Sequence, residues 1–117
     1  MLAELAALAL NADRVEEAET RARESLAIAD SLHDRPGRVF GVGLLAWAAA
    51  ARGEPERAGR LWGAIEDELA GAPLGGWQRH RDACELRIRG LAGPEFDRGL
   101  AEGRALTLDD AVSIALD

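Results

Sequence analysis

The stretch Ala51-Arg52-Gly53-Glu54-Pro55-Glu56-Arg57-Ala58 is typical of a tight turn between two antiparallel helices. Gly53 suits the position just after a helix end, where φ is often positive. Pro55 suits the first turn of the next helix, where a missing N–H costs nothing. Beyond the turn, apolar residues recur at the spacing of one helical face, namely Ala58, Leu61, Trp62, Ile65 and Leu69. We therefore predict a helical hairpin centred on Gly53.

The composition of the whole chain also favours helices. Its 117 residues suit one domain spanning 1–117, and 48% of them are hydrophobic. Only 4% are aromatic, with no Tyr, so the core must consist mostly of Ala and Leu. Both are strong helix formers, whereas the β-branched residues that favour strands are few. The predicted fold class is all-α.

Hydrophobic periodicity predicts further helices on both sides of this hairpin. Upstream they cover 2–11, 14–32 and 38–52, and the last is apolar nearly all round, as in a helix buried on most sides. Downstream they cover 55–70, 77–92, a short helix that begins at Pro94, and a last helix from 108 onward.

Local signals set the predicted ends of these helices. Asp13 and Glu16 have the spacing of a capping box at the start of the helix 14–32, and Thr107 and Asp110 have it before the last helix. The segment His33-Asp34-Arg35-Pro36-Gly37 predicts a break between the helices 14–32 and 38–52, and Pro36-Gly37 is its strongest signal.

The hairpin motif recurs along the chain. Asp13-Arg14-Val15-Glu16-Glu17-Ala18 superposes on Gly53-Glu54-Pro55-Glu56-Arg57-Ala58, and Gly93-Pro94-Glu95 repeats the turn once more. A period of about forty residues is typical of a helical solenoid, in which each hairpin buries its apolar face against a neighbour. We predict about three hairpins and a C-terminal helix.

Two segments resemble the second helix of a tetratricopeptide repeat: Glu17-Ala18…Ala22…Ser25-Leu26-Ala27-Ile28-Ala29 and Arg57-Ala58…Leu61-Trp62-Gly63-Ala64. The likeness continues through Ile65-Glu66, Gly71-Ala72-Pro73-Leu74, Pro94-Glu95-Phe96 and Glu102-Gly103-Arg104-Ala105-Leu106-Thr107-Leu108-Asp109-Asp110-Ala111-Val112. In this order and spacing the segments resemble the C-terminal tetratricopeptide-like region of large bacterial transcriptional regulators of the LuxR and AfsR types. Such regulators join an ATPase module and a DNA-binding module to long helical-repeat sensors.

The resemblance carries over only part of what those regulators do. All 14 basic residues are Arg, so the chain has no Lys with which to build a Gly-x-x-x-x-Gly-Lys phosphate loop, and no segment reads as a basic recognition helix. What remains is a non-catalytic protein–protein interaction or sensor module in signal transduction. Its partner would be another protein or the other modules of a parent regulator. The alternative is a helical domain that binds a small-molecule effector near Trp47 and Trp77, and an enzyme is the least favoured class.

The net charge of −7 argues against DNA or RNA as a direct partner. Such a field repels nucleic-acid phosphates. Arg79, Arg81, Arg87 and Arg89 come nearest to a basic patch, but such a run is typical of a solvated helix face. We expect no shift of duplex DNA by this chain in a gel-shift assay at physiological salt. Sub-micromolar binding would reveal a basic face that the composition hides.

The candidate site residues cluster in the second half of the chain. His80 and Cys84 lie at i and i+4, a spacing that can hold one edge of a metal site, but no second pair is present, so we expect no metal and no other cofactor. Cys84 lacks the base and oxyanion site that a nucleophile needs, so no catalytic residue is assigned. The predicted partner or effector groove comprises Trp47, Trp77, His80, Arg81 and Cys84.

Two further expectations concern location and assembly. The single Cys cannot form an intrachain disulfide, which fits the reducing cytoplasm, and no apolar run approaches the ~18 residues of a membrane span. Residues 1–10 carry a single charge, Glu4. A preceding repeat in a longer regulator would cover this apolar helix, and otherwise we expect a homodimer through it.

Overall fold

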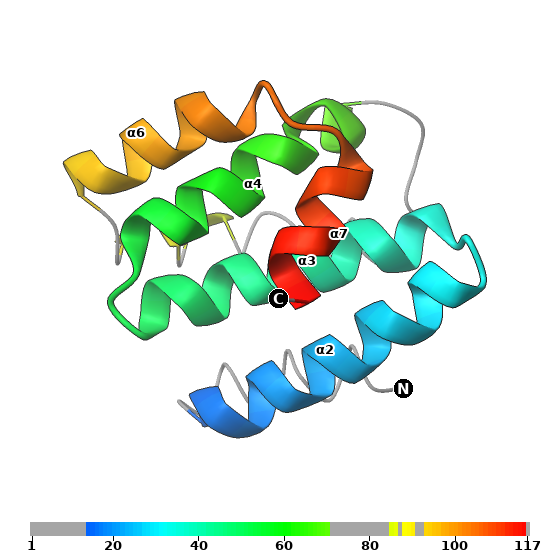
Figure 1. The fold of residues 1–117 in the computed structure, drawn as a ribbon. Helices are drawn as coiled ribbons and strands as arrows, with labels where there is room; N and C mark the ends of the chain where they lie inside the picture. Colours follow the sequence, from blue (N-terminus) through cyan, green and yellow to red (C-terminus); the bar gives the residue numbers. More distant parts are fainter. Residues whose placement is uncertain (1–13, 71–84, 87, 91–92, 117) are drawn as a thin grey trace.

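The computed structural model describes residues 14–70, 85, 86, 88–90 and 93–116, and within them every regular element is a helix (Figure 1). This confirms the predicted all-α class. The helices are α2 (Val15–Ser31), α3 (Arg35–Ala51), α4 (Pro55–Ala70), α6 (Pro94–Gly103) and α7 (Leu108–Leu116).

The turn between α3 and α4 has the predicted form. Gly53 has φ +81°, which L side chains rarely adopt, and its N–H donates to the carbonyl of Ala50 at 3.1 Å. The N–H of Glu54 donates to the carbonyl of Ala49 at 2.9 Å. Pro55 is the first residue of α4, where no intrahelical donor is needed.

The break between α2 and α3 falls where predicted but is shorter than the predicted segment 33–37. α3 begins at Arg35, so Pro36 falls inside its first turn instead of breaking the chain. The reversal occurs at His33, which has φ +54°. The other correction concerns the start of α2, where Arg14 and not Asp13 occupies the N-cap position and makes no side-chain cap.

The last helix begins with the predicted capping box. The N–H of Asp110 donates to Oγ1 of Thr107 at 3.1 Å, and the N–H of Thr107 donates to Oδ2 of Asp110 at 3.1 Å. Each side chain thus satisfies a backbone donor that the helix itself leaves without a partner.

The helices form a layered arrangement around α3 and α4 (Figure 1). α2 and α3 are packed neighbours joined by a short turn, and so are α3 and α4. α6 lies along the other side of α4, and α7 packs across α4, α3 and α2. α3 therefore contacts three helices, and it is buried from Gly41 to Ala50.

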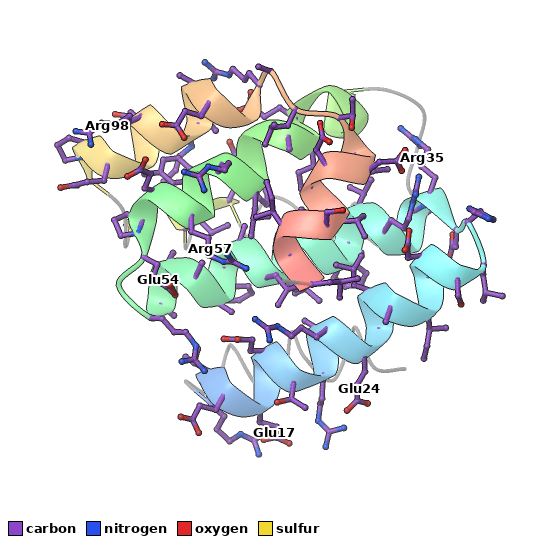
Figure 2. The ribbon with its side chains drawn as sticks, viewed as in Figure 1. Glu17, Glu24, Arg35, Glu54, Arg57 and Arg98 are labelled. Atoms are coloured by element: carbon purple, nitrogen blue, oxygen red, sulfur yellow. The ribbon has the colours of Figure 1, made fainter. Side chains whose placement is uncertain are left out.

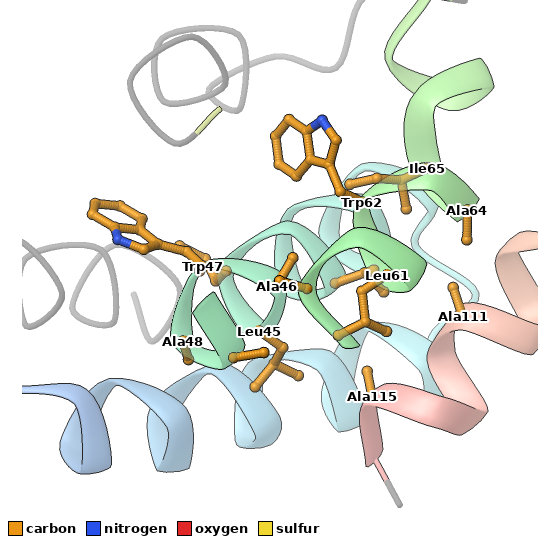
Figure 3. Packing of buried hydrophobic residues seen from close by; sticks show 14 of the residues in the cluster. Leu45, Ala46, Trp47, Ala48, Leu61, Trp62, Ala64, Ile65, Ala111 and Ala115 are labelled. Atoms are coloured by element: carbon orange, nitrogen blue, oxygen red, sulfur yellow. The ribbon is translucent and has the colours of Figure 1, made fainter. Parts of the chain in front are cut away.

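Small residues let these helices approach closely. Of the core side chains in the described residues, many are Ala, as the composition predicted. Figure 3 shows Ala111 and Ala115 of α7 beside Leu61 of α4, and all three are buried. A Cβ added to Gly41 of α3 would lie 2.9 Å from Cβ of Leu26, so glycine is needed for the contact between α2 and α3.

The helices α4 and α6 approach each other backbone to backbone. A Cβ added to Gly59 would lie 2.1 Å from the carbonyl oxygen of Phe96, and one added to Gly99 would lie 2.0 Å from that of Glu56. Gly63 and Gly103 make the same kind of contact one turn later, at 2.4 and 2.1 Å. We call these four glycines the glycine seam. A residue one turn later in α4 meets a residue one turn later in α6, so the two helices run parallel and in register.

Candidate functional site

The predicted groove is described only at one residue. Trp47 is 5% exposed and belongs to the hydrophobic core. Trp77, His80, Arg81 and Cys84 lie outside the described residues. So do Arg79 and Arg87 of the predicted basic run and residues 1–10 of the predicted dimer contact. The groove and the dimer therefore stay predictions.

The described residues contain a different feature, a cleft of about 300 Å³ between α2 and the turn that joins α3 to α4. α2 contributes a charged pair, α3 a small apolar surface, and the turn with the start of α4 three more charged side chains. The lining residues are Glu19, Arg23, Leu45, Ala49, Arg52, Glu54 and Arg57.

Glu19 is the centre of one half of this cleft. Its Oε1 pairs with Nη2 of Arg23 at 3.2 Å, one turn along α2, and its Oε2 pairs with Nε of Arg52 from the end of α3. Nε of Arg23 is buried and has no hydrogen-bond partner. One carboxylate thus holds two guanidinium groups, and the ion pair with Arg52 ties α2 to the turn.

The other half of the cleft is formed by the first turn of α4. Nη2 of Arg57 donates to the carbonyl oxygen of Ile114 in α7 at 2.8 Å, which leaves the other guanidinium donors for another acceptor. Within the described part of the chain, the Glu54 carboxylate makes no ion pair and no hydrogen bond. Figure 2 shows Glu54 and Arg57 together at the beginning of α4.

The sequence analysis missed this cleft, although one signal was present. A cation near a helix N-terminus is opposed by the helix dipole, so Arg57 in the first turn of α4 is unfavourable unless it has a partner. Its partner is a C-terminal carbonyl of α7, where the dipole favours a cation. The apposition of α2, which completes the cleft, has no local signature in the sequence.

Most other arginines that the structure describes are paired with carboxylates. Arg38 of α3 pairs with Asp109 of α7 at 3.0 Å and with Asp30 of α2 at 3.5 Å, and so joins three helices. Arg104 donates from Nε to Oε2 of Glu66 at 2.9 Å. This hydrogen bond, with the charge of Glu66, raises the pKa of Arg104. Because each of these arginines has a carboxylate partner, their positive charges are locally balanced.

Other kinds of site find no support in the described part of the chain. No group of three or more potential metal ligands occurs there. None of the helices there has both the length and the apolar character needed to cross a membrane. Comparisons with protein-family models, curated proteins and solved structures gave no match.

Proposed function

We propose that this chain is a non-catalytic protein–protein interaction module, built as a tetratricopeptide-like stack and serving a bacterial transcriptional regulator. Its partner is another protein or another module of the same regulator, in the cytoplasm. The sequence resemblance to the LuxR and AfsR types supplies the regulatory context. The packing of α4 against α6 supplies the physical support.

The observation that carries the proposal is the register of these two helices. Gly59 and Gly63 of α4 recur as Gly99 and Gly103 of α6, about forty positions later, and the four glycines face each other across the seam. Equivalent residues of two successive units therefore meet at the same level, as expected where like units stack. Ala18 and Ala58, the equivalent positions of α2 and α4, are both fully buried.

An exposed apolar pair on α2 indicates where a partner would bind. Ile28 is 53% exposed and Leu32, which follows α2, is 70% exposed. They lie four positions apart at one end of the helix, so their side chains extend on the same side. Large apolar side chains exposed together are common at protein contact sites.

Affinity capture with matched variants tests this role. The chain and an Ile28→Ser/Leu32→Ser variant are immobilised, exposed to a lysate of a G+C-rich bacterium, and compared by quantitative mass spectrometry. We expect the variant to lose at least one protein retained by the wild-type chain, with no loss of thermal stability. Leu86→Ser is the control, since Leu86 is 74% exposed elsewhere. If all three chains retain the same proteins, the module does not bind through α2.

A second candidate function, binding of a small-molecule effector, is favoured by a separate observation. The cleft beside Glu54 and Arg57 is a concave site that has polar groups of both signs. It lies apart from the exposed pair on α2, so one chain has room for both functions. The ligand class that suits the cleft is argued below.

A further inference from the structure

We propose that the cleft between α2 and the α3–α4 turn binds a free α-amino acid. Arg57 holds its carboxylate and Glu54 holds its ammonium group. This inference does not depend on the proposed partner-binding role. It rests on the size of the cleft and the pattern of charge within it.

The size limits the ligand to a small molecule. A volume of about 300 Å³ is at the lower end of the range for small-molecule sites. Apolar lining comes only from Leu45 and Ala49, which lie one turn apart on α3, so little room is left for a large hydrophobic group. A compact polar molecule is the class that fits.

The charges select among compact polar molecules. The carboxylate of Glu19 is already engaged by Arg23 and Arg52, and these three side chains together carry a net charge of +1. Two charged groups of the lining remain open to a ligand, the guanidinium of Arg57 and the carboxylate of Glu54. Glu54 directly precedes α4 and Arg57 lies in its first turn, yet no ion pair joins the two side chains.

A ligand of one sign would satisfy only half of this arrangement. A simple carboxylate would be attracted by Arg57 but repelled by Glu54. A simple amine, which is cationic, would be attracted by Glu54 but repelled by Arg57. A zwitterion has both groups on one carbon framework, so each meets a partner of opposite sign. Arg57 is suited to the carboxylate because guanidinium groups bind planar carboxylates through charge-assisted hydrogen bonds.

The first experiment titrates the full chain with each of the twenty common L-amino acids, followed by NMR chemical shifts in low-salt buffer. We expect saturable shifts at Arg52, Glu54 and Arg57 with at least one amino acid. Two derivatives of the best ligand serve as probes. The N-acetyl derivative lacks the ammonium charge, and the C-terminal amide of the amino acid lacks the carboxylate. Each should bind about tenfold more weakly or worse, since each loses a charge-assisted hydrogen bond.

Variants then assign the two contacts. Arg57→Gln should weaken binding of the free amino acid about tenfold while leaving the amide unchanged, and Glu54→Gln should abolish the preference over the N-acetyl form. Arg98→Gln and Glu24→Gln are the matched controls, because both side chains are exposed and lie away from the cleft (Figure 2). The Glu54 side chain loses no partner among the described residues, so its variant keeps the test valid if Arg57→Gln is unstable.

Three results would overturn the proposal. The first is the absence of saturable binding by every amino acid. The second is equal binding of the N-acetyl form and the free amino acid, or tighter binding of succinate, which would make the cleft a simple anion site. The third is that the free amino acid binds the wild-type chain and the Glu54→Gln variant equally well, and that both chains prefer it over the N-acetyl form to the same extent.

Discussion

Gly99→Ala should destabilise the protein by about 3 kcal/mol, since overpacking a close contact costs this much when neither side can move. The added Cβ would lie 2.0 Å from the carbonyl oxygen of Glu56 and 2.9 Å from the backbone nitrogen of Arg60. Both atoms belong to the helical backbone of α4 and cannot rotate away as a side chain would. α4 and α6 must therefore move apart, and this separation also loosens the backbone contacts at the other three glycines of the seam.

Thermal unfolding followed by circular dichroism measures this effect. For a chain of this size the loss corresponds to a melting temperature lower by roughly 10 °C. Gly90→Ala is the control, because a Cβ at Gly90 meets no heavy atom within 4 Å and Ala is the better helix former. We expect that variant to melt at the wild-type temperature or slightly above. Equal melting of Gly99→Ala and the wild-type chain would disprove the close approach of α4 and α6.

Trp62→Ala should lower the free energy of unfolding by about 3–5 kcal/mol, as large-to-small changes in protein cores do. Trp62 is 1% exposed and, within the described part of the chain, is the largest fully buried side chain. Figure 3 shows its indole extending from α4 on the side away from α7, so the loss is independent of the α7 contacts. Removing the indole leaves a cavity that the surrounding helices fill only in part.

Urea denaturation followed by circular dichroism is the appropriate measurement, because the substitution also removes a fluorophore. Leu32→Ala is the control, since Leu32 is 70% exposed and its truncation should change the midpoint little. A Trp62→Ala midpoint equal to that of the wild-type chain would place the indole at the surface and contradict the packing of α4.

Local rules were sufficient where the determining atoms lie close together in the sequence. The α3–α4 turn needs only a residue that tolerates positive φ at Gly53 and a residue without an N–H at Pro55. The capping box at Thr107 is equally local. The start of α3 was misplaced because proline both breaks helices and suits their first turn, so Pro36 fits either boundary.

The glycine seam shows why nonlocal contacts were missed. Gly59 and Gly63 reduce helix propensity, so propensity alone counts them as unfavourable in α4. Their repetition as Gly99 and Gly103 was the available signal, because two such pairs at the period of the repeat indicate helices that touch backbone to backbone. For the cleft, the sequence signal was limited to Arg57 in the first turn of α4, since the charged residues on α2 have the pattern of a solvated face.

The bond between Arg57 and α7 has a consequence for how freely the C-terminal segment can mutate. The acceptor is the main-chain carbonyl of Ile114, not its side chain. Any residue that keeps α7 helical at this position presents the same oxygen to Arg57. Sequence drift at position 114 therefore leaves the link to the cleft intact, whereas a single proline nearby, by bending α7, would remove it.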